Sequence, residues 1–465
     1  MMGDDAAVEG SSTVTTTTAD RGAAQGPPAE LDPERAAELM TSRRFVVLLV
    51  VVAVVGIVVS LAAWLFLEGI YQLDRELYTH LPSALGYDHG PPVWWPLPVL
   101  GLAGVVVAVA ITRLPGDGGH LPAKGLAIGG GTPHPIDLPG VIVAGLVTVG
   151  AGVVLGPEAP LIALGSGVAV LTVRLARSAT PPQVASVVAA AGGFAALSFI
   201  FDSPLIAAVL LIEATAIGGA RQALILVPGL LAAGVGTLVS IGMGSFTGLS
   251  SSAYALSALQ LPHFGHPDIA QFGWTIGLAA VIAVAARIVM LGGLATHRIV
   301  SRRLIVLLPA AGLVVAGLAI AFHGASGRGV DEALFSGQDA LGGLVAHAGT
   351  WSLSALALLI AFKGVAYGVS LGSFRGGPTF PALFLGAAGG IMAAHLPGFS
   401  LTPAIAVGMG AATAAVLRLP LSAAILATFL TISAGTGDEP LIIVGVVTAY
   451  LVAVALQRAP GHGRA

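Results

Sequence analysis

Long apolar runs, separated by short segments rich in glycine, proline or charge, make up most of the chain. The first run, Phe45–Leu67, has about 23 residues, enough to cross the core of a bilayer and too many for the core of a signal peptide. Further apolar helices are predicted at 95–113, 138–155, 159–175, 184–200, 204–217, 222–243, 271–292, 303–322, 352–371, 379–395, 402–416, 421–434 and 440–456. The pattern indicates an all-α polytopic membrane protein.

Several of these segments are shorter than the roughly 20 residues that a spanning helix needs, and glycine or proline opens them. Backbone that is not helical is tolerated at membrane depth only where protein or an aqueous cavity surrounds it. With 64 Gly and 29 Pro in the chain, we expect many tilted, partly broken helices that pack closely.

Two pairs of segments repeat along the chain. Gly156–Gly165 and Gly377–Gly386 share five identical residues at an offset of 221. Ser203–Leu210 matches Leu419–Leu426 at an offset of 216. Two collinear matches predict a pair of related halves, as many transporters have.

The chain is expected to contain a disordered acidic N-terminal tail (1–30), a short cytoplasmic helix (31–44), a transmembrane domain (45–456) with repeats at roughly 45–217 and 222–456, and a short C-terminal tail (457–465). The N-terminal tail has few large apolar side chains, so burial cannot offset the entropy lost on ordering it. Asp32 and Pro33 suit the N-cap and first position of the short helix. Arg43 and Arg44 favour a cytoplasmic N-terminus, in a plasma or inner membrane.

Composition excludes several classes of protein. Only 9% of residues are charged and 56% are hydrophobic, whereas roughly a quarter are charged in soluble domains. A net charge of −3 without a basic cluster argues against a nucleic-acid partner. Because the chain has no cysteine and no metalloprotease, P-loop or dinucleotide motif, we expect neither an enzyme nor a bound cofactor.

Both copies of the G-P-x-x-P motif precede a short apolar helix. Proline suits the first turn, where its missing N–H would be unpaired anyway. A helix N-terminus carries roughly half a positive charge, so two of them converging inside a membrane protein would hold an anion without a trapping cation. The alternative is that glycine and proline only break these helices for packing.

Glu158 lies between Pro157 and Pro160 in an apolar stretch. A carboxylate at the bilayer centre costs about 2.5–3.5 kcal/mol on insertion scales, so its presence needs a reason. A carboxylate can occupy the place of an anion and leave when it is protonated or displaced, which would make Glu158 a gate or a proton carrier. The alternative is a first-turn glutamate that stabilises its own helix.

Other charged residues also touch apolar runs. Glu213 is left open between a structural hydrogen-bonding role and a place on a water or proton path. Asp202 is expected to be an N-cap for the helix that begins near Pro204. Long basic side chains are expected to snorkel or pair rather than bind substrate; these are Arg287, Lys363, Arg375 and Arg418.

His120 and His134 lie in a glycine-rich stretch, and each has an aspartate three residues away. No helix fixes that spacing and no cysteine is present. We therefore expect solvated loop histidines rather than a metal site.

In content and order, these motifs resemble the CLC family of chloride channels and chloride/proton exchangers, over roughly residues 31–456. The family signature G-[KR]-E-G-P is similar to Gly156–Pro160, G-S-G-I-P to Gly118–Pro122, and G-x-F-x-P to Gly377–Pro381. The resemblance implies an inverted repeat of many tilted helices and a homodimer with one pore per subunit. It also implies that Glu158 is the gating glutamate and that backbone N–H groups at helix ends hold the anion.

The chain departs from the family pattern at several positions. Gly119 replaces the anion-binding serine, and Thr379 stands where the third signature has phenylalanine. Pro157 and Pro378 lack backbone donors near the expected ion sites. The anion-binding residues that the resemblance implies are Gly119, His120, Glu158, Ala159, Thr379 and Phe380.

The position of the exchanger's inner proton glutamate is Ala214 here, one residue after Glu213. A proton path would therefore need Glu213 as a substitute. The family's pore-lining tyrosine belongs to a helix near the chain's end, but Tyr450 already lies within the last apolar run.

The expected function is transport of chloride, or a similar small inorganic anion, through a bilayer-embedded pore gated by Glu158. Passive flow is favoured because Ala214 replaces the proton glutamate. The alternatives are a proton-coupled chloride antiporter, a member selective for fluoride or another anion, and, from a different class, a cation-coupled transporter of organic solutes. Chloride is the expected bound and transported ion.

Overall fold

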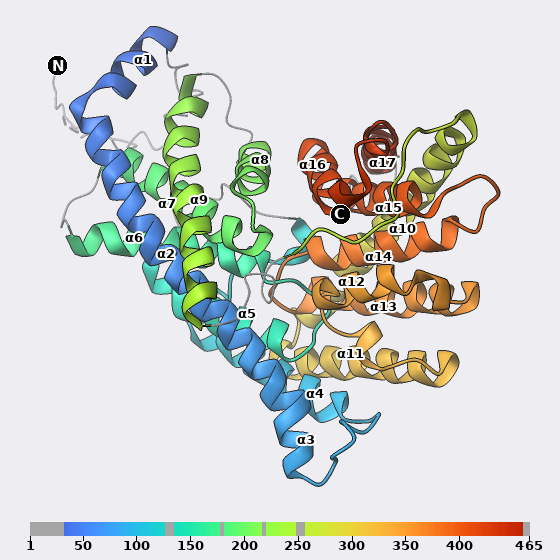
Figure 1. Cartoon of the computed structure of the whole chain (residues 1–465). Helices are drawn as coiled ribbons and strands as arrows, with labels where there is room; N and C mark the ends of the chain where they lie inside the picture. Colours follow the sequence, from blue (N-terminus) through green and yellow to red (C-terminus); the bar gives the residue numbers. More distant parts are fainter. Residues whose placement is uncertain (1–31, 126–133, 177–180, 216–219, 248–255, 459–465) are drawn as a thin grey trace, which may run out of the picture.

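The computed structural model describes residues 32–125, 134–176, 181–215, 220–247 and 256–458, and Figure 1 shows them as a bundle of helices. The predicted tail 1–30 lies outside these residues, and so does 459–465 of the C-terminal tail. Within the described ranges the regular structure is helical, with a single isolated two-residue bridge and no strand.

The helices are α1 (Pro33–Thr41), α2 (Arg43–Arg75), α3 (Leu81–Ala84), α4 (Pro96–Arg113), α5 (Leu138–Gly150), α6 (Glu158–Ala176), α7 (Pro182–Phe201), α8 (Pro204–Thr215), α9 (Ala220–Thr247), α10 (Ile269–Val300), α11 (Leu304–Ser326), α12 (Gln338–Ala346), α13 (Leu353–Ser373), α14 (Thr379–Ala393), α15 (Leu401–Leu417), α16 (Pro420–Thr431) and α17 (Glu439–Arg458). Among the described residues, 9 helical segments are long and apolar enough to cross a membrane. Every predicted apolar segment coincides with a helix, which confirms the all-α membrane fold. The sequence pattern missed α12, whose apolar run is short and interrupted by two glycines.

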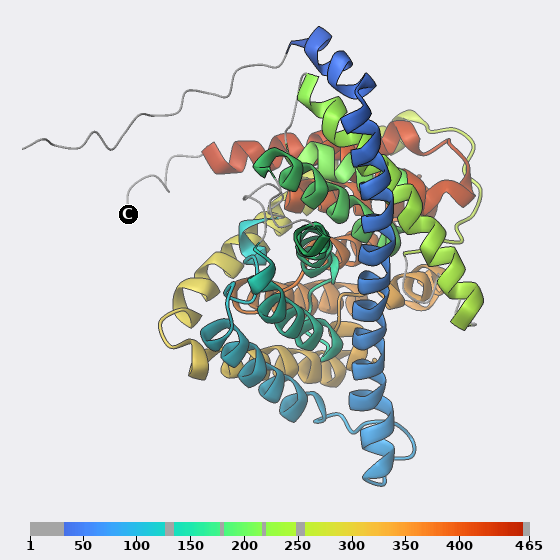
Figure 2. The ribbon, with the colours of Figure 1, turned by 90° about the vertical axis from the view of Figure 1, so that its left-hand side faces the viewer.

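The N-terminal helices begin at side-chain caps. Asp32 accepts a hydrogen bond from the Glu34 N–H at 3.2 Å, as its predicted N-cap role requires. Ser42 ends α1 and caps α2 by accepting from Phe45 N–H at 3.2 Å, so Arg43 and Arg44 open α2 instead of closing α1. From Arg43, helix α2 runs along the length of the molecule toward α3. Figure 2 shows this course from the side.

The two halves share a helix pattern. Helices α6 and α14 begin 221 residues apart, and α8 and α16 begin 216 residues apart, matching the sequence repeat. Asp202 ends α7 and Arg418 ends α15, both in the left-handed conformation with φ of 47° and 61°. Asp202 is thus the C-cap of α7, and at the start of α8 the Ser203 hydroxyl accepts from Ile206 N–H at 3.4 Å. The prediction of Asp202 as an N-cap missed this turn, because the sequence alone does not show a left-handed residue.

Paired glycines let consecutive helices touch through their backbones. A Cβ on Gly165 of α6 would lie 2.5 Å from the Gly192 carbonyl oxygen of α7. In the second half, a Cβ on Gly386 of α14 would overlap the Gly408 carbonyl oxygen of α15. Such close approach is the usual way in which small residues pack membrane helices.

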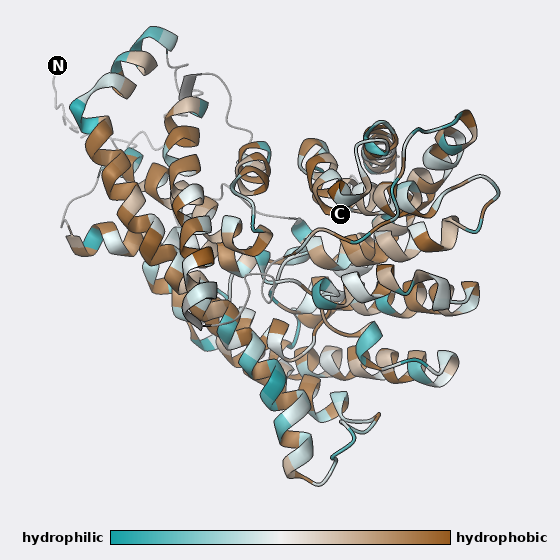
Figure 3. Ribbon diagram, in the orientation of Figure 1, coloured by the Kyte–Doolittle hydropathy of each residue, from teal (hydrophilic) through white to brown (hydrophobic). Residues whose placement is uncertain are grey.

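Large apolar side chains face outward along the helices, and Figure 3 shows the long helices as predominantly hydrophobic. Examples are Leu102, Leu238, Val281 and Leu451. An exposed apolar surface of this extent is unfavourable in water and favourable against lipid. The protein is therefore an integral membrane protein.

The glycine contacts predict different outcomes for two alanine substitutions on α14. Gly386→Ala should lower the free energy of unfolding by about 1–3 kcal/mol, because the methyl group collides with the α15 backbone. Gly389→Ala is the matched control, since its Cβ would meet only the Ile282 side chain at an ordinary 3.7 Å. That control should be neutral or stabilising by up to about 1 kcal/mol through helix propensity. Denaturant unfolding in detergent micelles measures both, and equal effects would contradict the close crossing.

Candidate functional site

The two G-P motifs meet at the centre of the molecule. Gly156 N–H donates to Gly377 O at 2.8 Å, and Gly377 N–H donates to Gly156 O at 2.6 Å, in an antiparallel bridge. These two glycines occupy equivalent positions in the two repeated sequence segments. The pairing places the N-termini of α6 and α14 beside each other.

Glu158 is completely buried at this junction. Its Oε1 accepts a hydrogen bond from the Thr379 backbone N–H at 2.5 Å, at the N-terminus of α14. Its Oε2 and the Thr379 hydroxyl have no hydrogen-bond partner within the part of the chain that the structure describes. The N–H groups of Phe380 and of Glu158 itself also lie near enough to stabilise the carboxylate. One carboxylate thus occupies the point at which two positive helix ends converge.

Two glycines form the cradle that holds this carboxylate. A Cβ on Gly377 would overlap the carboxyl carbon of Glu158, and a Cβ on Gly156 would overlap its Oε2. No residue other than glycine fits at either position while Glu158 is seated.

Aromatic side chains enclose the same space. The rings of Phe201 and Phe380 are buried with their centroids 5.8 Å apart. The buried Tyr367 hydroxyl of α13 donates to Pro378 O at 2.6 Å, directly before the N–H that binds Glu158. Sequence analysis missed Tyr367, because it lies in an apolar run without a motif and reaches the site only through the packing of α13 on α14.

The loop that carries Gly119 and His120 has unusual backbone geometry. Four successive residues from Gly116 have φ of 84°, 51°, 68° and 99°, and Gly119 N–H donates to Gly116 O at 2.8 Å. The His120 Nε2 lies 2.9 Å from Gly125 O. Burial lowers the pKa of His120, and the positive charges of Lys124 and Arg375 lower it further. The hydrogen bond with Gly125 O raises the pKa, but by less than burial lowers it. His120 is therefore neutral at pH 7.

Arg375 reaches the same loop from the second half. Its Nε donates to Asp117 O at 3.1 Å and its Nη1 to Phe374 O at 3.2 Å. The side chain is only 8% exposed, so it does not snorkel to a water interface.

Lys363 is a second buried cation, on α13. Its Nζ donates to Glu332 O at 3.0 Å and Leu334 O at 2.5 Å, and lies 4.5 Å from the centroid of the Phe384 ring. Backbone carbonyls and an aromatic face thus surround the ammonium group. Of the two expected roles, snorkelling or pairing, snorkelling is wrong for Lys363 and for Arg375, because both are buried and donate to backbone carbonyls.

Glu213 binds the end of a helix in the opposite half. Its carboxylate accepts from Leu421 N–H at 2.9 Å, from Ser422 N–H at 2.7 Å and from the Ser422 hydroxyl at 2.6 Å. These donors belong to the first turn of α16, which the negative charge also stabilises. Ala214 follows it on α8 and brings no titratable group.

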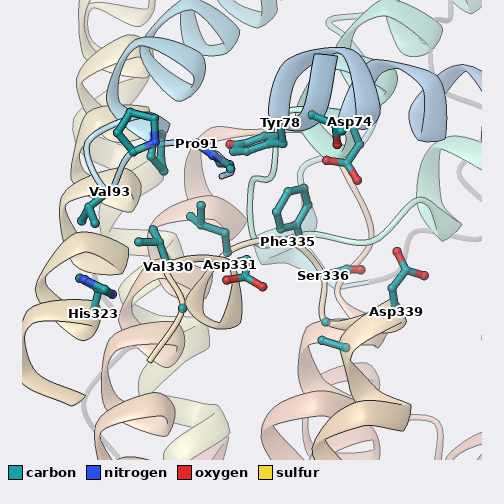
Figure 4. Close-up of a pocket in the computed structure, with 18 of the residues that line it drawn as sticks. Asp74, Tyr78, Pro91, Val93, His323, Val330, Asp331, Phe335, Ser336 and Asp339 are labelled. Atoms are coloured by element: carbon teal, nitrogen blue, oxygen red, sulfur yellow. The ribbon is translucent and has the colours of Figure 1, made fainter. Parts of the chain in front are cut away.

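A cavity of 690 Å³ opens near α3, at the end of the molecule away from α1. Figure 4 shows its lining, which includes the carboxylates of Asp74, Asp331 and Asp339. No lysine or arginine is among the described residues that line it. The cavity therefore has an acidic character.

Two residues that line this cavity contact the segment that precedes Gly156 in the chain. The Tyr78 hydroxyl donates to Ala151 O at 2.8 Å, and Phe335 N–H donates to Gly152 O at 2.9 Å. The rings of Tyr78 and Phe335 meet edge to face, with centroids 5.2 Å apart. Residues 151–152 stand shortly before Gly156 in the chain.

Comparison with known proteins identifies relatives. The family model described as "Voltage gated chloride channel" matches residues 123–454. A protein of Escherichia coli O1:K1 named "Putative ion-transport protein YfeO" is 31% identical over 348 residues, which cover 74% of this chain and 78% of the relative. The protein of the same name from Shigella sonnei has the same identity and coverage.

Solved structures share the fold. A slow cyanobacterial Cl⁻/H⁺ antiporter superposes with a TM-score of 0.70 at 20% identity, covering 89% of this chain and 95% of its own. A CLC-type fluoride/proton antiporter gives a TM-score of 0.66 at 18% identity, covering 89% and 97%. A eukaryotic CLC transporter gives 0.62 at 16% identity, covering 89% and 73%.

The capping contact of Glu213 predicts a structural effect of its removal. Glu213→Ala should lower the free energy of unfolding by about 1–2 kcal/mol, because the first turn of α16 loses its acceptor. Glu213→Gln keeps an acceptor oxygen and should lose less. Denaturant unfolding in micelles measures both, and an Ala variant as stable as the parent would contradict the capping role.

Proposed function

Because the chain belongs to the voltage-gated chloride channel family, we propose that it passes chloride or a similar small inorganic anion through a pore that the Glu158 carboxylate closes. The observation that carries this proposal is the seat of Glu158. Its carboxylate is buried in the cradle of Gly156 and Gly377 and accepts a hydrogen bond from the N-terminus of α14.

The seated carboxylate takes the place of a transported anion. A halide needs the same environment, namely N–H donors and a positive helix end in a water-free site. Protonation removes the charge that holds the side chain to Thr379 N–H, and a competing anion can displace it. In either case Glu158 leaves the cradle and the position becomes available to an anion.

The site also favours release. Thr379 N–H and its helix end supply partial charges, and no lysine or arginine among the described residues forms an ion pair with Glu158. Conduction requires binding that is strong enough for entry and weak enough for departure. At the seat of Glu158 itself, donors that carry partial charges meet that requirement.

Passive flow is the form of transport that we propose. Proton coupling would need a relay on the far side of the gate, and Glu213 is the carboxylate that the sequence offers for it. The Glu213 carboxylate accepts three hydrogen bonds at the start of α16, which favours a structural role over a proton relay. Ala214, the next residue, has no titratable side chain.

We also propose a cytoplasmic N-terminus in a plasma or inner membrane, as Arg43 and Arg44 before the first span favour. The family resemblance supports a homodimer with one pore per subunit. Chloride would then be the bound and transported ion in each subunit.

Chloride efflux from liposomes tests the gate. In the parent protein, flux should rise several-fold from neutral to acidic pH, because protonation unseats Glu158. Glu158→Gln should give high flux at every pH, since it mimics the protonated side chain. Glu439→Gln is the matched control: Glu439 also opens an apolar helix, α17, but lies outside the cradle, so its pH response should equal that of the parent. An unchanged pH response in Glu158→Gln would contradict the role of Glu158 as the gate.

The same assay, with external pH recorded under a potassium-ionophore clamp, distinguishes the modes of transport. Chloride flux without linked proton movement supports passive flow. Proton movement against the proton gradient, driven by a chloride gradient, would overturn passive flow and support a proton-coupled antiporter. If chloride does not move, fluoride and nitrate are measured next, and failure of all three would overturn anion transport.

The cradle predicts that a single methyl group opens the pore. Gly377→Ala should give pH-independent flux like that of Glu158→Gln, because the Cβ occupies the space of the carboxyl group. The double variant should behave like either single variant, since both remove the same contact. Additive effects, or a normal pH response in Gly377→Ala, would contradict the cradle.

A further inference from the structure

Arg375 is a buried cation that forms no ion pair with a carboxylate of the described residues. Only 8% of it is exposed, and its Nε and Nη1 donate to backbone carbonyls. Its Nη2 has no hydrogen-bond partner among the described residues, and no carboxylate there lies within 4.0 Å of the guanidinium. A buried charge is costly unless it is paired, so this geometry calls for an anion from outside the chain.

The position of Arg375 places that anion near the gate. Arg375 precedes Gly377 by two residues, which span at most about 7 Å of backbone, and Gly377 contacts the Glu158 carboxylate. Its side chain packs on the Gly118–Gly119 loop, where a Cβ on Gly118 would lie 3.4 Å from the Arg375 Cγ. The Arg375 side chain therefore lies against this loop, on the residue two before Gly377.

The neighbouring groups leave the charge to Arg375. His120 is neutral at pH 7, because burial lowers its pKa, and its Nε2 faces Gly125 O. Asp117 accepts from Arg375 through its backbone carbonyl, and its exposed carboxylate is a nearby negative charge that forms no ion pair with the guanidinium. Lys124 adds positive charge on the same side.

We infer that Arg375 binds the transported anion directly, at a position beside the Gly118–Gly119 loop, and so sets which anions the protein takes. The inference rests on the proposed anion transport. Gly119 has no side chain to bind an ion, so the guanidinium supplies the donor from the other half of the chain. A planar guanidinium offers parallel N–H groups, which match a planar oxyanion such as nitrate better than a spherical halide.

Side-specific transport kinetics test the assignment. Initial efflux rates are measured against chloride or nitrate concentration in liposomes with oriented protein. Arg375→Gln should raise the half-saturating concentration by about 10-fold or more, as expected when a charged donor is lost, and should raise it more for nitrate than for chloride. Arg375→Lys should keep most of the chloride affinity and lose the nitrate preference.

Arg328→Gln is the matched control. Arg328 also donates to a backbone carbonyl, Thr350 O at 2.6 Å, and its guanidinium lies 3.7 Å from the Trp351 ring centroid, away from the Gly118–Gly119 loop. Its variant should keep both half-saturating concentrations. A purely structural Arg375 would change protein stability and leave the nitrate-to-chloride ratio intact.

The outcomes separate this inference from the proposed function. Parental affinities and an unchanged nitrate-to-chloride ratio in Arg375→Gln would overturn the role of Arg375 while transport itself stands. If Arg375→Gln does not fold, an unchanged ratio in Arg375→Lys would overturn it equally. Absence of flux in the parent protein would instead overturn the proposed function.

Discussion

Every backbone N–H and C=O at membrane depth must find a partner inside the protein, and the centre of this molecule follows from that constraint. Helices α6 and α14 begin in the buried interior, and each leaves unpaired N–H groups at its end. The loops before them pair with each other through Gly156 and Gly377. One of the N–H groups left unpaired by the backbone is that of Thr379, and it donates to the Glu158 carboxylate. The Glu158 carboxylate thus supplies an acceptor for a helix-end N–H group that the backbone does not pair.

The same constraint explains the abundance of glycine. Short helices can bring their ends together only if they cross closely, and the Gly165–Gly192 and Gly386–Gly408 contacts provide this in both halves. Carboxylate caps solve the problem at other helix ends, as Glu213 does for α16. Glycine contacts thus bring the helices close together, and carboxylates such as Glu213 accept from the N–H groups at their ends.

The sequence predicted the features that are local or repeated. Apolar runs marked the helices, and a carboxylate between prolines in such a run marked Glu158. Features that depend on contact between the halves were not visible, because spacing along the chain does not show which helix ends meet. The seat of Glu213 on α16, the reach of Arg375 to Asp117 and the approach of Tyr367 to Pro378 all belong to this class.

The two halves match at the bridge between Gly156 and Gly377 but differ in the side chains that follow it. Two residues beyond each glycine, equivalent positions hold Glu158 in one half and Thr379 in the other. Had duplication preserved both residues as glutamate, two like charges would share one buried pocket and could not both ionise. The difference at this one pair of positions leaves a single carboxylate in the pocket between the two helix ends.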